Sequence, residues 1–181
     1  LMTGKSINNN TQQYAILSMN HSSKIKFISN EEIILEIILD NWSENNQSKI
    51  VMEISLHKDS PLLSFNLEVD WYESHKLLKV EFPLDIESNI VRYETQFGYT
   101  ERPTHVNHST DASMFETCGH KYASLSEPGY GVALLNNCKY GYSCRESILC
   151  LSLLRSPKSP DPNCDMGKHT FRYGLYPHLN S

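Results

Sequence analysis

The feature that most constrains the fold of this chain is an alternation of apolar and polar residues over short segments. In residues 63–71, LSFNLEVDW, the odd positions are apolar and the even positions are polar. A period of two places one set of side chains against a core and the other set in water, as in a half-buried strand. The same alternation recurs over residues 78–82 and 91–97. These segments predict strands that end at Pro83 and Gly98.

Other segments are also typical of strands, although residues 31–40, EEIILEIILD, would equally suit an amphipathic helix. Their β-branched content and the short flanking turns favour a strand. Residues 156–162 contain three prolines and predict a loop. Many short strands with few helices predict an all-β fold, a β-sandwich. The further strands are predicted at residues 50–56, 130–135, 147–154 and 169–175.

Length and charge bound the class of protein. At 181 residues the chain is long enough for one core, which predicts a single domain over residues 1–181. A formal net charge of -5 argues against a nucleic-acid-binding surface. No apolar run is long enough to span a membrane, and the N-terminus lacks the layout of a signal peptide. Because Leu1 precedes Met2, we expect the chain to be a fragment of something larger.

The five cysteines are an odd number and form no CxxC pair. A zinc site or a disulfide framework would show paired spacing, so free thiols in a reducing compartment are the favoured interpretation. The sequence also has no nucleophile elbow, Walker A loop, GxGxxG or HExxH motif. The carboxylates of the predicted strands fall mostly on their wet faces and are interpreted as a solvated surface.

The densest polar cluster is residues 102–108, RPTHVNH, which we expect to form a loop. Three interpretations of it stay open. His105 and His108, with Asp111, have a weak resemblance to a metal site, because loop histidines need further ligands placed by the fold. The polar groups could instead satisfy one another. In the third interpretation, Arg102 and His105 line a sugar site or a domain interface.

A second distinctive stretch is residues 126–144, SEPGYGVALLNNCKYGYSC, in which an apolar run stops abruptly at a polar segment, residues 136–141. The polar segment is either an ordinary surface hairpin or a loop presented to a ligand or another domain. Tyr130, Tyr140 and Tyr142 lie among glycines and are candidates for exposed contacts. Trp71, in contrast, falls on the apolar face of its strand and is expected in the core.

Several long blocks of the chain together resemble the C-terminal β-domain of glycoside hydrolase family 38 α-mannosidases, in the cytosolic and vacuolar branch. The resemblance runs from about residue 50 to residue 178. The blocks are WYESHKLLKVEFPLDI, YETQFGYTERPTH, HKYASLSEPGYGVALLNNCKYG, LSLLRSPKSPDP and DMGKHTFRYGLYPH.

The resemblance implies a supersandwich of the galactose-mutarotase-like kind and a parent that is a retaining exo-α-mannosidase. It also implies zinc, or cobalt, in the catalytic domain of that parent, where metal and carboxylates act on the sugar. No stretch here matches the catalytic motifs of the family, so no catalytic residue, metal ligand or cofactor is assigned to this chain. Its expected partners are the catalytic domain of the same polypeptide and a mannose-containing oligosaccharide, with neither nucleic acid nor membrane. The expected location is the cytoplasm or the vacuole.

The resemblance further implies that the C-terminal domain lends a loop to the rim of the active-site groove. Asn136, Lys139 and Tyr140 are the residues expected on that loop, with Arg102 and His105 as further rim or interface residues. Two positions depart from the family: Asn137 stands where relatives usually carry aspartate, and Thr110 where they usually carry tryptophan. An aromatic sugar contact and a salt bridge are therefore not carried over.

Two alternatives to this role stay open. The chain could be a free-standing carbohydrate-binding module, or a purely structural β-domain without catalysis. If it is a domain of a longer enzyme, we expect apolar surface that meets the remainder of the polypeptide to be exposed, with self-association of the fragment as a consequence.

Overall fold

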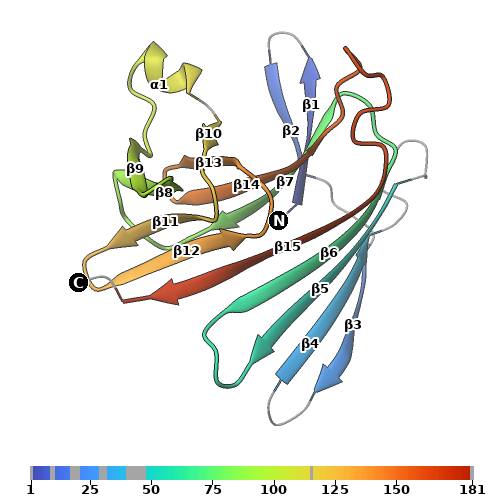
Figure 1. The fold of residues 1–181 in the computed structure, drawn as a ribbon, viewed down its shortest axis with the longest axis horizontal. Helices are drawn as coiled ribbons and strands as arrows, with labels where there is room; N and C mark the ends of the chain where they lie inside the picture. The colour runs from blue at the N-terminus through green and yellow to red at the C-terminus, as the bar shows by residue number, and fades with distance from the viewer. Residues whose placement is uncertain are drawn as a thin grey trace. The chain divides into compact units, whose positions relative to one another are not determined.

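The structure, a computed structural model, describes residues 2–8, 11–16, 21–28, 32–39, 48–114 and 116–179. Within those ranges the chain forms fifteen β-strands and one helix of a single turn (Figure 1). The predicted all-β fold class is therefore confirmed. None of the helices in the described ranges is long and apolar enough to cross a membrane.

The chain divides into two compact units. The first unit contains residues 80–152 and 173–181, and the second contains residues 2–79 and 153–172. Three strands supply residues to both units: β7 (Lys76–Pro83), β14 (Ile148–Arg155) and β15 (Gly167–His178). The prediction of one sandwich domain over residues 1–181 stays a prediction.

In the second unit, four consecutive antiparallel strands stand side by side in the order β3-β4-β5-β6, and residues 167–172 of β15 come next. The segment that also suited a helix is the strand β4, so the preference for a strand is confirmed. A hairpin of β1 and β2 belongs to the other sheet, beside β7. The bounds are β1 (Met2–Asn8), β2 (Thr11–Ile16), β3 (His21–Ile28), β4 (Glu32–Leu39), β5 (Lys49–His57) and β6 (Leu63–Trp71).

The alternation in β6 builds the core of the second unit. The side chains of Phe65, Leu67, Val69 and Trp71 are all buried, as the period of two predicts. Trp71 lies fully inside, and its indole N–H donates to the hydroxyl of Ser156. Placing this large ring in the core confirms the prediction for Trp71.

A buried carboxylate also belongs to the second unit. Glu73 accepts a hydrogen bond of 2.8 Å from the Ser48 hydroxyl and pairs with the Lys76 ammonium at 2.6 Å. Because a buried charge needs such partners, this cluster fixes the segment that leads from β6 into β7.

The first unit contains parts of two antiparallel sheets. One part has the order β9-β8-β11-β12-β15, the last through residues 173–178, and the other has the order β10-β13-β14-β7. The bounds are β8 (Ile90–Thr95), β9 (Gly98–Pro103), α1 (Ser109–Ser113), β10 (Thr117–Cys118), β11 (Tyr122–Glu127), β12 (Tyr130–Asn136) and β13 (Gly141–Arg145).

Aromatic pairs join the two sheets within the first unit. Tyr93 of β8 and Tyr142 of β13 have ring centroids 5.9 Å apart, and Phe82 of β7 meets Tyr173 of β15 at 6.2 Å. These contacts between opposite layers are what define a sandwich. The two-layer architecture predicted for this chain is therefore present in the first unit.

Seven of the predicted strands coincide with β5, β6, β7, β8, β12, β14 and β15, and the predicted loop at residues 156–162 is confirmed. The expectation that residues 102–108 form a loop is wrong at its start, because Arg102 and Pro103 close β9. The strands β1, β2, β3, β9, β10, β11 and β13 and the helix α1 were not predicted. β10 is only two residues long, and β11 carries serines at two of its non-core positions, so neither of these two strands gives a clear apolar signal.

Replacing Trp71 with phenylalanine should destabilise the protein by about 2–3 kcal/mol, because it leaves a cavity and removes the donor to Ser156. The neighbouring change Tyr72→Phe should alter the free energy of unfolding by less than about 0.5 kcal/mol, because that side chain is exposed. Urea unfolding followed by circular dichroism measures both. Equal midpoints for the two variants would contradict the proposed core.

Candidate functional site

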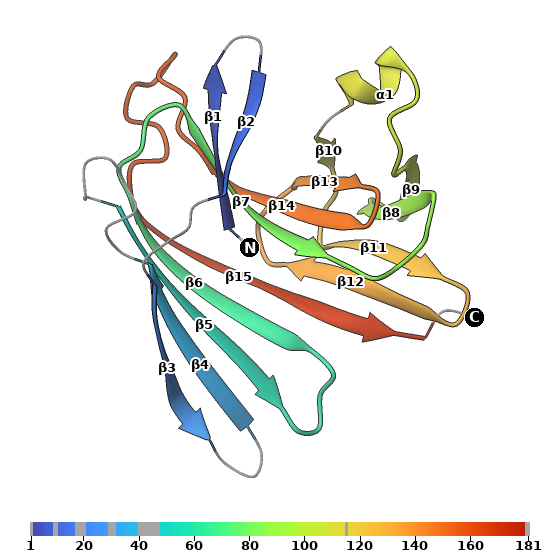
Figure 2. The same ribbon diagram turned by 180° about the vertical axis from the view of Figure 1, so that it is seen from behind.

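The polar segment after β12 passes from one sheet to the other within the first unit. β12 pairs with β11 and β15, whereas β13 pairs with β10 and β14. Residues 137–140 therefore connect two layers and do not close a hairpin between neighbouring strands (Figures 1 and 2). Of the two interpretations of this segment, the ordinary hairpin is wrong.

Asn136 braces this crossing loop, defined as residues 137–140, from within. Its side-chain oxygen accepts a hydrogen bond of 2.6 Å from the backbone N–H of Lys139. Its amide nitrogen donates to the backbone carbonyl of His120 at 2.9 Å and to the phenol oxygen of Tyr142. Both ends of the amide are engaged within the unit, so Asn136 fixes the loop.

Tyr142 is the buried support of the same loop. It is 0% exposed, so the interpretation of Tyr142 as an exposed contact is wrong. Its hydroxyl accepts from Asn136 and donates to the His120 carbonyl at 3.4 Å. Burial raises the pKa of the Tyr142 phenol above its usual range, and the hydrogen bond from Asn136 offsets part of that rise. The phenol is therefore a neutral donor at physiological pH.

The loop exposes Tyr140, which follows Lys139 in the chain. Tyr140 is 57% exposed, and its ring meets the edge of His120 with centroids 5.6 Å apart. A hydrogen bond of 3.0 Å from the Gly119 N–H to the Tyr140 carbonyl fixes the backbone beneath the ring. Lys139 is half-buried. The structure thus places an aromatic ring and a lysine on one backbone segment that is held at several points.

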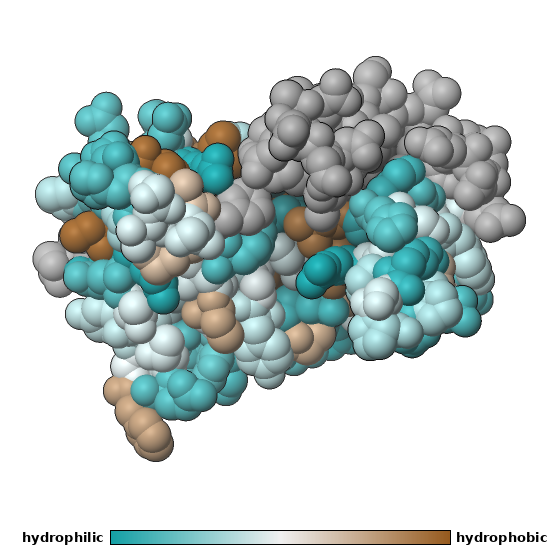
Figure 3. Space-filling model, turned by 90° about the horizontal axis from the view of Figure 1, so that it is seen from above, coloured by the Kyte–Doolittle hydropathy of each residue, from teal (hydrophilic) through white to brown (hydrophobic). Residues whose placement is uncertain are grey.

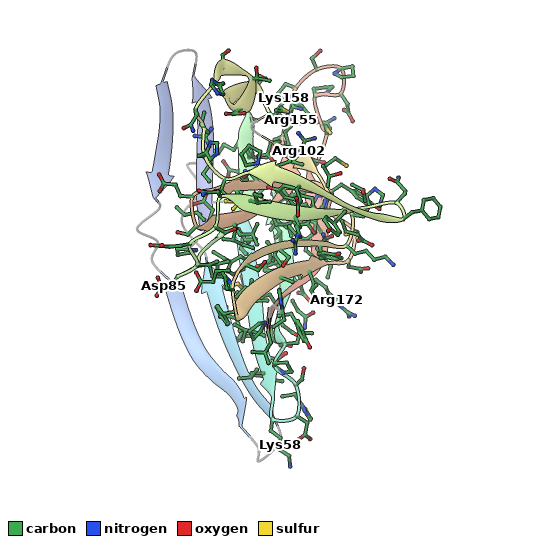
Figure 4. The ribbon with its side chains drawn as sticks, turned by 90° about the vertical axis from the view of Figure 1, so that its left-hand side faces the viewer. Lys58, Asp85, Arg102, Arg155, Lys158 and Arg172 are labelled. Atoms are coloured by element: carbon green, nitrogen blue, oxygen red, sulfur yellow. The ribbon has the colours of Figure 1, made fainter. Side chains whose placement is uncertain are left out.

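Arg102 and His105 lie together elsewhere in the first unit, in the lining of a small hollow that also includes Tyr93 and Asp111. Arg102, labelled in Figure 4, comes from the end of β9. Its Nη1 approaches the sulfur of Met114 at 3.0 Å, and its buried Nε has no hydrogen-bond partner in the described part of the chain. His105 is exposed.

The helix α1 accounts for Asp111 without a metal. The Asp111 carboxylate accepts hydrogen bonds of 3.1 Å from the backbone N–H groups of Asn107 and His108, which caps the start of the helix. Across the described ranges, no group of three His, Cys, Asp or Glu residues is placed to hold a metal ion. His105, His108 and Asp111 therefore do not fit a zinc site. Thr110 is exposed on this helix.

The five predicted site residues thus form two groups. The first is Asn136, Lys139 and Tyr140 on the crossing loop, and the second is Arg102 with His105 at the hollow. The Tyr93–Tyr142 ring pair lies between the groups, because Tyr93 lines the hollow and Tyr142 bonds to Asn136. His120 and Tyr142 are the supports that sequence reasoning missed, and no spacing signal could find them, since they meet Asn136 only through the fold.

The five cysteines, Cys118, Cys138, Cys144, Cys150 and Cys164, are free thiols in this structure. Cys144 also lines the hollow and is buried. Burial, with a smaller contribution from the nearby Cys150 thiol, raises the pKa of the Cys144 thiol to about 12. This thiol is therefore neutral and is not a nucleophile at physiological pH.

Comparison with known proteins identifies several relatives of this chain. The family model for the glycosyl hydrolases family 38 C-terminal domain matches residues 6–163. Alpha-mannosidase 2C1 of Homo sapiens is 52% identical over 134 residues, which cover 74% of this chain and 13% of the human protein. The α-mannosidase of Saccharomyces cerevisiae is 40% identical over 173 residues, 92% of this chain and 16% of the yeast protein. The chain therefore spans only a small part of the length of these relatives.

A solved structure shares the fold. The crystal structure of an α-mannosidase from Enterococcus faecalis V583 matches 99% of this chain and 26% of its own chain, with a TM-score of 0.84. At 15% sequence identity, this likeness shows the fold alone.

The change Asn136→Asp should destabilise the protein by about 2 kcal/mol, because the new carboxylate cannot donate to the His120 carbonyl. The matched change Asn137→Asp, next to it on the exposed loop, should cost less than about 0.5 kcal/mol. Urea unfolding of the two variants measures the difference. If both cost the same, Asn136 is not the brace of the loop.

Stability should decline in alkali because of the Cys144 thiol. Its folded pKa is raised above the ordinary 9.0 to about 12, so its contribution is complete below about pH 9 and is lost as the pH rises towards 12. Cys144→Ala should flatten the decline just above pH 9 by up to about 1.4 kcal/mol per pH unit. Unfolding at several pH values measures the slope. Cys118→Ala, at an exposed thiol, is the control and should leave the slope unchanged.

Proposed function

The chain belongs to the glycosyl hydrolase family 38 C-terminal domain family, and we propose that it is the ancillary C-terminal domain of a longer α-mannosidase. In this role it supports the catalytic domain of the same polypeptide. It also contributes the crossing loop to the rim of the groove in which a retaining exo-α-mannosidase removes terminal α-mannose from an oligosaccharide.

The observation that carries the proposal is the braced presentation of Lys139 and Tyr140. Asn136 accepts a hydrogen bond from the Lys139 N–H and donates to His120 and Tyr142, so the loop is anchored and loses little conformational freedom when a ligand binds. A loop of this kind suits a rim that must keep its shape. A surface that meets only water does not require a backbone anchored in this way.

The side chains of Lys139 and Tyr140 match the chemistry of a sugar. The Lys139 ammonium can donate to sugar hydroxyls or pair with a carboxylate of the catalytic domain, and hydrogen bonds from a charged donor are among the strong ones. The Tyr140 ring offers an apolar face with a polar tip, which is suited to a partly wet contact. Arg102 and His105 would meet the catalytic domain or the outer sugars from the hollow.

The chemical step belongs to the catalytic domain in this proposal. A zinc or cobalt ion there would orient the sugar and help to polarise it. Residues of the present chain would bind and orient the oligosaccharide from the rim. No described residue is assigned to proton transfer or nucleophilic attack.

The proposed location is the cytoplasm or the vacuole. The five free thiols support a route through a reducing compartment, because thiols in secreted domains usually pair.

The test compares the 181-residue chain with the longer polypeptide that carries it, on a chromogenic α-mannoside with added zinc or cobalt. We expect the longer polypeptide to be active and the chain alone to be inactive. Activity of the chain alone would contradict the assignment. Activity of neither would favour a binding module or a structural domain.

In the active longer polypeptide, Lys139→Ala should lower kcat/KM by about 10-fold to 100-fold, because a hydrogen bond from a charged donor is lost. Tyr140→Ala should act in the same direction. Lys58→Ala is the matched control: this exposed lysine lies in the turn between β5 and β6 of the second unit (Figure 4). An equal effect of all three changes, or an unchanged kcat/KM in the loop variants, would contradict the rim role.

A further inference from the structure

Phe97 stands at the tip of the hairpin between β8 and β9, and its side chain is more exposed than any other large apolar side chain that the structure describes. Its relative exposure is 109%, against 55% for Tyr99 on the same hairpin. The strand register pairs Thr95 with Gly98, so Gln96 and Phe97 alone make the turn. Figures 1 and 2 show this hairpin at the end of its sheet.

The backbone of Phe97 is in the left-handed region, with φ at 64°. At the second central position of a two-residue turn, a positive φ is the place of glycine or asparagine, because a Cβ atom is crowded there. A bulky residue in this region is a genuine outlier. The turn therefore carries a side chain that strains its backbone and gains no burial within its own unit. Strain of this kind is retained where the residue has another use.

The residues around the Phe97 ring favour an apolar partner. On the same hairpin, Arg92 pairs with Glu101 at 2.9 Å and lies over the Tyr99 ring at 5.2 Å from its centroid. The two charges neutralise each other, so the hairpin has no net charge there to attract a charged partner. The described part of the face shown in Figure 3 is mainly hydrophilic, with a few hydrophobic side chains among the polar ones. Phe97 differs from such residues because its backbone has a positive φ.

We propose that Phe97 is an anchor that inserts into an apolar pocket of the preceding part of the same polypeptide. The inference rests on the proposed function, namely that this chain is the C-terminal domain of a longer α-mannosidase. Relatives extend far beyond the matched region, which is 13% of the human protein and 16% of the yeast protein. The family model is that of a C-terminal domain, so such proteins have a preceding part that can supply the pocket.

A second copy of the chain is a poorer occupant. A symmetric contact would need a pocket for the ring on the chain itself. Of the two hollows described in the first unit, one contains the charged residues Arg102, Asp111 and Arg145, and the other is lined mainly by polar residues, among them Glu87, Asn89 and Glu146. Neither matches a benzyl ring. An apolar anchor in a matching pocket is, in contrast, the usual centre of a stable interface.

The direct test is hydroxyl-radical footprinting of Phe97 in the 181-residue chain and in the longer polypeptide, each referred to the urea-unfolded protein. We expect the ring to be oxidised freely in the chain and roughly tenfold more slowly in the longer polypeptide, because a ring at an interface core is fully desolvated. Equal oxidation in both proteins would overturn the proposal. Protection in the chain alone that grows with concentration would also overturn it, in favour of a second copy.

A substitution at Phe97 gives a second test, because it should shift the unfolding midpoints of the 181-residue chain and of the longer polypeptide in opposite directions. Phe97→Asn relieves the backbone, so it should raise the unfolding midpoint of the 181-residue chain by about 2–4 °C. In the longer polypeptide the same change removes the anchor and should lower the midpoint. Gln96→Asn, at the other turn position, is the control and should change neither. A rise in both proteins would overturn the proposal.

These results separate the anchor from the proposed function. An active α-mannosidase with an unprotected Phe97 would overturn the anchor and leave the function standing. A protected Phe97 in a longer polypeptide without α-mannosidase activity would support the anchor and contradict the function.

Discussion

The contact between Tyr93 and Tyr142 is the interaction on which both groups of candidate residues depend. It joins the two layers of the first unit, and each ring also lies next to one of the two groups of candidate residues. The Tyr142 hydroxyl engages Asn136 beneath the crossing loop, whereas Tyr93 lines the hollow beside Arg102. Burial raises the pKa of both phenols, so neither becomes charged in the core near neutral pH. The crossing loop and the hollow are thus supported by an uncharged, close-packed core.

The strands that could be predicted are those with one buried face, because their apolar residues recur at every second position of the sequence. β6 is such a strand, since its odd residues fill the core and its even residues do not. β13 could not be found in this way, because three consecutive residues, Tyr142 to Cys144, are buried. The tyrosine among glycines suggested exposure, but pairing with β10 and β14 encloses it. Local composition was overridden there by a tertiary contact.

The polar segment could be singled out from the sequence, but the hydrogen bonds that its residues make could not. Family resemblance identified the crossing loop, and the structure presents Lys139 and Tyr140 on it. Asn136 was grouped with them although its amide faces inward. Its partner His120 lies 16 residues earlier in the chain, and no pattern of spacing relates the two. Asp111 is a similar case, because the HxxH spacing suggested a ligand whereas the carboxylate caps α1.

The crossing loop has a consequence for how such domains diverge. Residues 137–140 lead from β12 in one layer to β13 in the other, and both ends are tied to residues 119–121 by backbone hydrogen bonds. An inserted residue would have to be absorbed by moving a sheet, whereas an exchanged side chain at Lys139 or Tyr140 disturbs neither layer. The side chains of this segment can therefore change during evolution far more readily than its length, and we expect relatives to differ here by substitution and to keep the same number of residues.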